Sequence, residues 1–352
     1  MDITPYLKLL VDKKGSDLFF SSGAPVKIKI EGVVSSVGKT VLTGDIVKAA
    51  AYGIMNERLT KKFEERMEVD FAITLPDRGA RFRANVFRQR GEVSMVLRLV
   101  PTQIPTIDDL GLPEILKTLM MHKRGLILMV GATGAGKSTT LAAMINHRNL
   151  QMPGHILTIE DPIEFSHPNI KAVINQREVG VDTHSYADAL RSAMREAPDV
   201  LLIGEIRDRE TMEAALQLCN TGHLCLSTMH ANNANQAMER IINLFPQNLY
   251  KQLYMDLSLN IRTVISQRLV MGVDGKRVAA MEIMINTPHI ADLILKGNIG
   301  EIKEAMEQSG AKGMATFDMA LYNLYKDEHI SLEEALSNAD SRTNLEARIN
   351  FG

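Results

Sequence analysis

The octapeptide Gly-Ala-Thr-Gly-Ala-Gly-Lys-Ser at residues 131–138 decides the fold, because its glycines and lysine have the spacing of a phosphate-binding P-loop. The apolar run LILMV at 126–130 precedes it and predicts a buried strand, whereas TTLAAMINHRN at 139–149 predicts a helix. This strand–loop–helix context is the one that the motif requires. The sequence therefore predicts a nucleotide site, and a glycine-rich turn with a stray lysine is a weak alternative.

Each part of the P-loop has an expected contact. Gly131, Gly134 and Gly136 let the backbone curl so that its N–H groups point at phosphate oxygens. Lys137 is expected at the β- and γ-phosphates of ATP, and the Ser138 hydroxyl at a Mg²⁺ ion. The predicted nucleotide-contacting residues are Gly131, Ala132, Thr133, Gly134, Ala135, Gly136, Lys137, Ser138 and Thr139.

Length and composition fit a soluble enzyme or motor. The chain has 352 residues, enough for about two domains, and 40 basic against 42 acidic residues, which does not indicate a general nucleic-acid binder. No apolar run is long enough for a transmembrane segment, and the charged N-terminus does not resemble a signal peptide, so we expect a cytoplasmic protein that can dock on a membrane complex. Two cysteines predict free thiols, and the cysteines and histidines between 219 and 230 match no common zinc template.

Hydrophobic periodicity predicts an α/β chain of several parts. Residues 1–100 mix strands and helices, with helices at 43–52 and 56–68, and the two prolines near 101–111 indicate an extended linker. Over 112–283, apolar strands alternate with helices and predict a parallel sheet with the nucleotide at its carboxyl edge. The remainder, 284–352, is polar and helical.

Acidic residues and a histidine follow predicted strands of that sheet. Glu205 comes after the apolar strand 200–203, where a Walker B acid would hold Mg²⁺ or its water, although aspartate is more usual. The segment TIEDPIEF at 158–165 offers further carboxylates, one of which could activate water, with a solvated acidic turn as the alternative. His230, at the end of another strand, is a candidate γ-phosphate contact or an ordinary structural histidine.

An arginine cluster occurs in the first part of the chain. In the predicted strand 81–86, Arg81 and Arg83 project from one face, and Phe82, Ala84 and Val86 from the other. A solvated basic face, arginine fingers that reach a neighbouring subunit's γ-phosphate, and a nucleic-acid contact remain open as explanations. The complete cluster is Arg78, Arg81, Arg83, Arg88, Arg90 and Arg98.

Taken together, these motifs resemble those of the secretion ATPases of type II secretion and type IV pili, over nearly the whole chain. In that family the P-loop is followed by an Asp box, a Walker B segment and a His box, which here are similar to TIEDPIEF at 158–165, APDVLLIGEIRD at 197–208 and GHLCLSTMH at 222–230. The pilus retraction ATPases are the most similar branch. The sequence IADLILKG at 290–297 departs from the C-terminal AIRNLIRE of the main retraction ATPase and resembles the accessory type.

The resemblance implies a PAS-like α+β N-terminal domain, a RecA-like P-loop NTPase domain and a helical C-terminal extension. It implies Glu164 as the catalytic carboxylate, Glu205 and Ser138 at Mg²⁺, and His230 at the γ-phosphate. It also implies that Arg81, Arg83 and Arg98 contact a neighbour's nucleotide, with residues 100–106 as a hinge.

Several partners follow from the same resemblance. The implied ligands are ATP and Mg²⁺, and the implied assembly is a homo-hexameric ring. The implied protein partners are an inner-membrane pilus platform protein, beside which the chain would be a peripheral cytoplasmic motor, and a partner retraction ATPase. No stable nucleic-acid partner is expected. The implied activity is ATP hydrolysis that powers or assists pilus retraction and twitching motility; the alternatives are an accessory ring that supports a partner ATPase and, less favoured, a nucleic-acid translocase.

Overall fold

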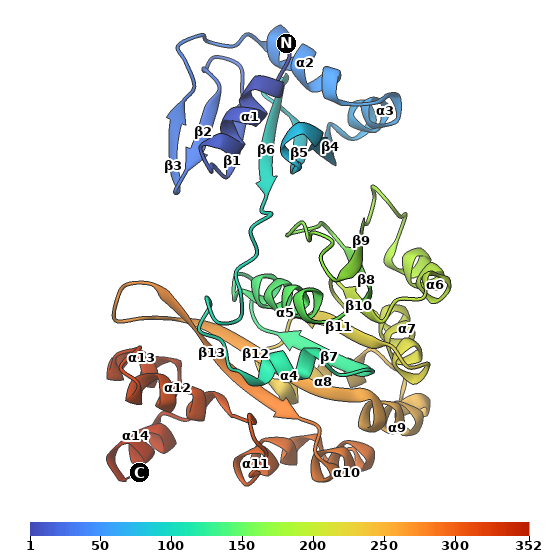
Figure 1. Cartoon of the computed structure of the whole chain (residues 1–352), viewed down its shortest axis with the longest axis vertical. Coiled ribbons are helices and arrows are strands. Elements are labelled where there is room, and N and C mark those ends of the chain that lie inside the picture. The colour runs from blue at the N-terminus through green and yellow to red at the C-terminus, as the bar shows by residue number, and fades with distance from the viewer. Residues whose placement is uncertain (352) are drawn as a thin grey trace. The chain divides into compact units, whose positions relative to one another are not determined.

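The computed structural model describes residues 1–351 and divides into two compact units (Figure 1). The N-terminal unit contains residues 1–103 together with 164–166. The C-terminal unit contains residues 104–163 and the chain from His167 onward. Within the described chain, no helix combines the length and apolar character needed to cross a membrane.

The N-terminal unit is a six-stranded sheet with the order β3-β2-β1-β6-β5-β4, and its neighbouring strands are antiparallel. Phe82, Ala84 and Val86 are buried on one face of β5, and Arg81 and Arg83 alternate with them, as the sequence predicted. The strands are β1 (Asp17–Phe20), β2 (Lys27–Ile30), β3 (Val33–Ser36), β4 (Glu68–Leu75), β5 (Ala80–Gln89) and β6 (Glu92–Val100). The helices are α1 (Thr4–Asp12), α2 (Gly44–Ile54), α3 (Glu57–Arg66) and the 3₁₀ turn η1 (Pro76–Arg78).

The helix predicted over 56–68 is wrong at its C-terminal end. Met67 has a φ of 64°, in the left-handed region that ends helices, and its N–H donates to the Phe63 carbonyl. Glu68 therefore begins β4 instead of continuing α3.

The C-terminal unit is built on a seven-stranded sheet with the order β13-β12-β7-β11-β10-β8-β9. Its strands are parallel except for β13, which pairs with β12 in an antiparallel hairpin at the edge. The strands are β7 (Gly125–Val130), β8 (Gly154–Glu160), β9 (Ala172–Glu178), β10 (Val200–Ile203), β11 (Leu224–Met229), β12 (Ile261–Met271) and β13 (Arg277–Ile285). The strands predicted at 126–130 and 200–203 are both present.

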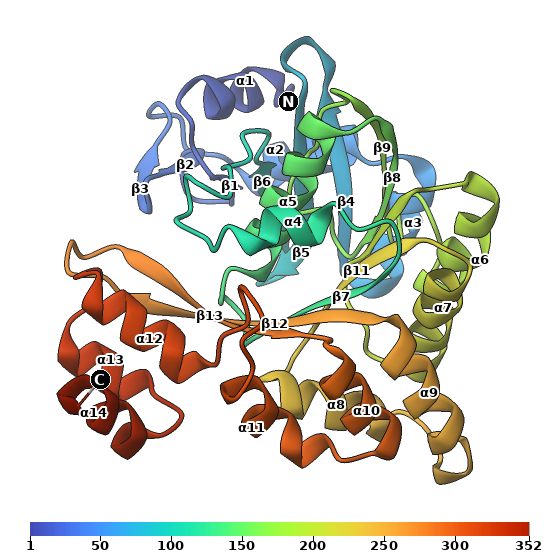
Figure 2. The same ribbon diagram turned by 60° about the horizontal axis from the view of Figure 1, so that its bottom comes forward.

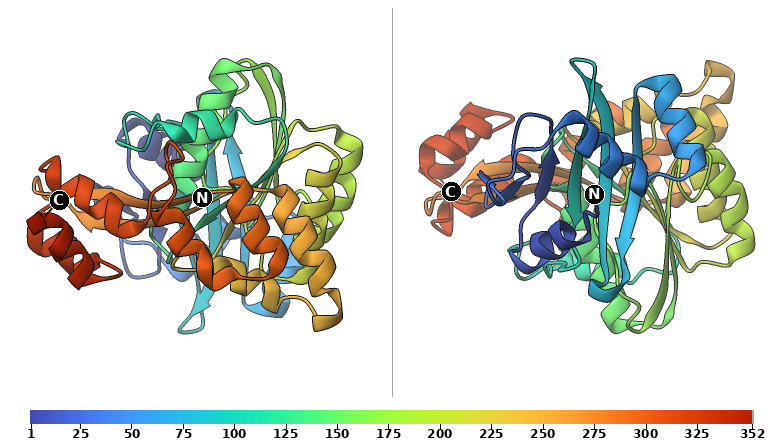
Figure 3. Two further views of the ribbon diagram at one scale, coloured as in Figure 1. Left: turned by 90° about the horizontal axis from the view of Figure 1, so that it is seen from below. Right: turned by 90° about the horizontal axis from the view of Figure 1, so that it is seen from above.

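Alternation along β7 divides the apolar interior of this unit into two layers. Leu126, Leu128 and Val130 pack with the side of the sheet that α6–α11 cover, whereas Ile127 and Met129 pack with α4 and α5. Figure 2 shows these two helical layers, and the left view in Figure 3 looks onto α9, α10 and α11. The helices are α4 (Ile115–Met120), α5 (Lys137–Gln151), α6 (Tyr186–Glu196), α7 (Arg209–Asn220), α8 (Ala234–Asn243), η2 (Gln247–Leu249), α9 (Tyr250–Asn260), α10 (Pro288–Lys296), η3 (Ile299–Glu301) and α11 (Ile302–Glu307). The sheet is thus covered on both faces, as expected of a parallel α/β core.

The last helices pack against the β12–β13 hairpin. Val270 and Ala280 of the hairpin form a small buried cluster with Leu321, Ala335 and Leu345. The helices are α12 (Phe317–Lys326), α13 (Leu332–Asn338) and α14 (Arg342–Phe351). The polar C-terminal stretch is therefore helical, as predicted, and has an apolar interior of its own.

The pH dependence of stability should report on His167. Its Nδ1 is buried with no hydrogen-bond partner among the described residues, and burial lowers its pKa from 6.5 to about 4. Below pH 6.5 the unfolded chain takes up a proton that the native imidazole does not, so native stability falls as pH falls. This group alone should remove about 2 kcal/mol of unfolding free energy between pH 7 and pH 5. Urea unfolding at both pH values should show a smaller loss for His167→Phe than for the wild type; an equal loss would contradict the assignment.

Candidate active site

The P-loop connects β7 to α5 through a turn in which two positions accommodate only glycine. Gly131 and Gly136 have φ values of 151° and 85°, both in the region that disfavours side chains. A Cβ on Gly131 would lie 2.6 Å from the main-chain oxygen of Gln267, and a Cβ on Gly136 would lie 2.8 Å from the Gln267 side-chain nitrogen. The turn is thus packed tightly against β12.

Lys137 begins α5 and bends back into the loop. Its Nζ donates hydrogen bonds to the carbonyls of Gly131 at 2.8 Å and Ala132 at 3.0 Å. Burial lowers the pKa of Lys137, and the negative charge of Glu205 acts in the opposite direction. The lysine is therefore partly removed from solvent, and its ammonium group is held by two carbonyls of the loop.

Gln267 of β12 holds both ends of the turn and is only 3% exposed. Its Nε2 donates to the Ala135 carbonyl at 2.7 Å, and its Oε1 accepts from the Thr140 hydroxyl at 2.8 Å. Both polar atoms of this amide are therefore used to fix the P-loop to the first turn of α5.

Glu205 follows β10 through Gly204, whose main chain is fixed on both sides. The Gly204 N–H donates to the Ile159 carbonyl at 2.7 Å, and its carbonyl accepts from the Thr228 hydroxyl at 2.6 Å. A Cβ at Gly204 would lie 2.7 Å from the Tyr186 hydroxyl. The carboxylate that follows is thus placed by two neighbouring strands.

The Glu205 carboxylate lies between two nitrogen donors. Arg207 Nη2 is 2.7 Å from Oε2, and His230 Nε2 is 3.3 Å from Oε1. The paired carboxylate raises the pKa of Arg207. Because Glu205 also acts electrostatically on Lys137, the structure brings together the P-loop lysine, the Walker B acid and the His-box histidine.

A pocket of about 450 Å³ opens beside this group. The P-loop contributes Gly131 and Ala132, and α8 together with the loop that precedes it contributes the rest of the wall. Arg240 Nη1 donates to the His230 carbonyl at 2.8 Å, which ties α8 to the His-box loop. The other lining residues are Ala231, Asn232, Gln236, Glu239 and Asn243.

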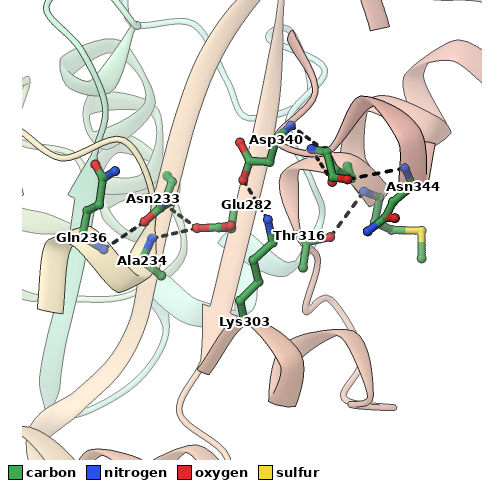
Figure 4. Close-up of polar contacts among 12 residues, drawn as sticks. Asn233, Ala234, Gln236, Glu282, Lys303, Thr316, Asp340 and Asn344 are labelled. Atoms are coloured by element: carbon green, nitrogen blue, oxygen red, sulfur yellow. Dashed lines mark hydrogen bonds and ion pairs between the residues drawn. The ribbon is translucent and has the colours of Figure 1, made fainter. Parts of the chain in front are cut away.

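The buried carboxylate of Glu282 fixes the N-terminus of α8. It is 2% exposed and accepts from the Ala234 N–H at 2.7 Å and from the Ser266 hydroxyl at 3.1 Å (Figure 4). Burial raises the pKa of Glu282, and these two hydrogen bonds act against the rise. One wall of the pocket therefore depends on a carboxylate from β13.

The remaining predicted site residues lie elsewhere. Glu164 is exposed and belongs to the short segment 164–166 that groups with the N-terminal unit. Glu160 of the same acidic segment is 9% exposed and accepts from the Thr158 hydroxyl at 2.7 Å. Glu160 is thus committed to internal hydrogen bonds, whereas Glu164 is accessible to solvent.

The three predicted arginines share one face of the N-terminal sheet. Arg83 of β5 is paired in register with Arg98 of β6, and Arg98 is paired in turn with Asp17 of β1. Arg98 Nε lies 2.7 Å from the Asp17 carboxylate, which is 4% exposed. Arg81, two residues before Arg83, lies on the same side of β5.

Comparison with known proteins identifies the family. A family model described as "Type II/IV secretion system protein" matches residues 2–326. The chain belongs to this family. The order of P-loop, Asp box, Walker B segment and His box in the structure is the order expected for a type II/IV secretion system protein.

Individual relatives show which members of this family the chain resembles. "Type IV pilus ATPase PilU" of Pseudomonas aeruginosa strain PAO1 is 50% identical, and the match covers 100% of this chain and 92% of the relative. "Type IV pilus retractation ATPase PilT" of the same strain is 42% identical, over 96% of this chain and 98% of the relative. A crystal structure of the pilus retraction motor PilT with bound ADP has a TM-score of 0.89 at 40% identity, covering 98% of this chain and 99% of that one.

These matches confirm the α/β fold class and the resemblance to pilus retraction ATPases of the PilT and PilU kind. Since the relatives are named ATPases and the P-loop is complete, this member of the type II/IV secretion system protein family is a nucleotide-binding P-loop ATPase.

Motif analysis missed three residues that shape the site of this family member: Gln267, Glu282 and Arg207. Arg207 comes two residues after Glu205, where a basic residue so close to the acid was a usable signal. Gln267 interrupts the apolar run of β12, and an uncharged polar residue in a buried strand is a sign of an internal hydrogen-bond partner.

Replacing Gln267 by leucine should weaken nucleotide binding. The change leaves the Ala135 carbonyl and the Thr140 hydroxyl without their partner, and each unsatisfied buried group costs about 1–3 kcal/mol. The dissociation constant for ADP, measured by calorimetry, should rise by about tenfold or more. Gln247→Leu, at an exposed position in η2, is the matched control and should bind ADP like the wild type. Folded Gln267→Leu protein with unchanged affinity would contradict the role of this amide.

Proposed function

We propose that the chain is a motor that hydrolyses ATP to drive or assist the retraction of a type IV pilus. The observation that carries the proposal is that Glu205 lies 3.3 Å from His230 and acts electrostatically on Lys137, beside a pocket that His230 lines, in a chain that aligns along its full length with PilU. A chain that served only as a binding module would not need a Walker B carboxylate next to its P-loop lysine.

The residues present fit ATP with Mg²⁺. Gly131, Gly134 and Gly136 have the positive φ values of a curled loop whose N–H groups can face an anion, and Ser138 is exposed at the start of α5. Ser138 and Glu205 would hold Mg²⁺, directly or through water, and a bound Mg²⁺ supplies charge neutralisation for the β- and γ-phosphates. Lys137 would exchange its two carbonyl partners for phosphate oxygens.

Two further residues have proposed roles at the transferred phosphate. His230, 3.3 Å from Glu205, would contact the γ-phosphate through the pocket that it lines. Glu164 would orient the attacking water, as the resemblance to the secretion ATPases implies, and its side chain is accessible to solvent.

Arginines of the N-terminal sheet would complete the site of a neighbouring subunit. Arg83 and Arg98 occupy directly paired positions, and like charges so placed destabilise a sheet unless an anion compensates them. Asp17 compensates the charge of Arg98. Arg83 is therefore the better candidate to contact a phosphate group bound in another subunit, and Arg81 lies beside it on the same strand. This arrangement favours an arginine finger over a merely solvated basic face.

The proposed assembly is a homo-hexamer at the cytoplasmic side of the inner membrane, peripheral to a pilus platform protein. The segment 100–106 would be the hinge about which the arginine-bearing domain closes when nucleotide binds. The 50% identity to PilU favours the accessory type, which works with a partner retraction ATPase. In that variant of the proposal the ring hydrolyses ATP and also supports its partner.

Purified protein should hydrolyse ATP in a Mg²⁺-dependent reaction, and Lys137→Ala and Glu164→Gln should each lower kcat by about 100-fold or more. Lys137→Ala should also weaken nucleotide binding, whereas Glu164→Gln should leave it near the wild-type value because the P-loop is intact. Lys312→Ala, an exposed charge change outside the site, is the control. Wild-type turnover by the Lys137→Ala protein would overturn the assignment.

Mixing two inactive variants tests whether Arg83 acts between subunits. Arg83→Ala and Lys137→Ala should each hydrolyse little ATP alone. When the two are mixed and allowed to exchange subunits, some sites combine an intact P-loop with an intact Arg83 from the neighbour, so hydrolysis should reappear. The control mixes Arg83→Ala with the double variant, in which no interface is complete. If hydrolysis does not reappear in the first mixture, although a fluorescent label shows that the subunits have exchanged, then Arg83 does not act in trans.

A further inference from the structure

A second pocket brings the C-terminal helices to the P-loop. Its volume is about 330 Å³, and P-loop residues from Gly131 to Ala135 form one wall. Arg268 of β12 and Asn338, the last residue of α13, form part of the opposite side. The other lining residues are Asn232, Gln267, Leu269 and Arg277.

Arg268 holds the C-terminal segment through contacts with three different residues. Its Nη1 donates to the Asn338 carbonyl at 3.0 Å, and its Nη2 lies 2.8 Å from the Asp340 carboxylate. Its guanidinium group stacks over the Phe317 ring, 3.8 Å from the ring centre. A single side chain from the central sheet thus connects α12, α13 and the segment that follows α13.

Asp340 is the anionic centre of this cluster. Its side chain is 14% exposed, and besides Arg268 it contacts Lys303 of α11 at 3.1 Å (Figure 4). The backbone around it is also fixed, because the N–H groups of Asp340 and Ser341 donate to the Asp318 carboxylate at 2.7 and 3.1 Å. The carboxylate is therefore largely shielded from solvent and set in one position.

Three consecutive residues of β12 connect this cluster to the proposed nucleotide site. Ser266 bonds to Glu282, which fixes α8; Gln267 fixes the P-loop; and Arg268 holds the C-terminal segment. Because neighbouring residues in a strand are separated by only about 3.3 Å along its axis, a shift of the Arg268 main chain would be passed to Gln267.

We propose that Asp340 is a positioning residue of the nucleotide site: by holding Arg268, it keeps the 338–341 segment and β12 in the arrangement that shapes the pocket beside the P-loop. This inference rests on the proposed ATPase function and assigns the C-terminal helices a share in nucleotide affinity. Asp340 itself does not touch the reacting atoms.

Steady-state ATP hydrolysis by the full-length protein tests the proposal. Asp340→Asn and Arg268→Gln should each raise KM for ATP by about tenfold, with kcat changed by less than about twofold. Their effects should not add, so the double variant should resemble either single variant, because both changes break the same contact. Additive effects on KM, or an unchanged KM in folded Asp340→Asn protein, would overturn the proposal.

Two control variants separate positioning from general stability. Lys303→Met removes the other ion pair of Asp340, and it should lower the melting temperature with KM within about twofold of the wild type. Glu346→Gln breaks the exposed pair with Arg342 in α14 and should change neither quantity. If Lys303→Met raises KM as much as Asp340→Asn, the effect is general loosening and the proposal fails. Absence of wild-type hydrolysis would instead contradict the ATPase function itself.

Discussion

The nucleotide site depends on one buried amide, that of Gln267, which bonds to the loop and to the helix on either side of the P-loop lysine. A P-loop has few side chains of its own, so its shape must be imposed by neighbouring structure. Here β12 imposes it twice, since the Gln267 carbonyl also lies where any side chain on Gly131 would project. The glycines of the motif and Gln267 of β12 therefore have to fit against each other, and a change at either would disturb the same contact.

The groups with proposed roles in hydrolysis reach this loop from the carboxyl ends of neighbouring parallel strands. Glu205 follows β10 and His230 follows β11, and the Thr228 hydroxyl of β11 donates to the Gly204 carbonyl that precedes Glu205. Such an arrangement lets groups distant in sequence meet without any loop having to fold independently.

Much of this arrangement could be predicted, because it is encoded by local patterns. The P-loop at 131–138 with its flanking strand and helix, and the acid after an apolar strand at Glu205, are readable from a few adjacent residues. The contacts of Gln267 with Ala135 and Thr140 span more than a hundred residues of sequence, and no local period reports them. The end of α3 at Met67 was missed for a different reason: a left-handed cap on a non-glycine residue has no composition signal.

The position of Lys137 sets what an anion has to offer in order to bind the loop. The Lys137 ammonium group donates to the carbonyls of Gly131 and Ala132, so an incoming anion would have to replace both of these acceptors. Hydrogen bonds from the N–H groups of the curled backbone to the anion would offset that loss. A polyphosphate has more oxygens with which to make such bonds than a single phosphate group, so the longer anion would gain more from the same loop.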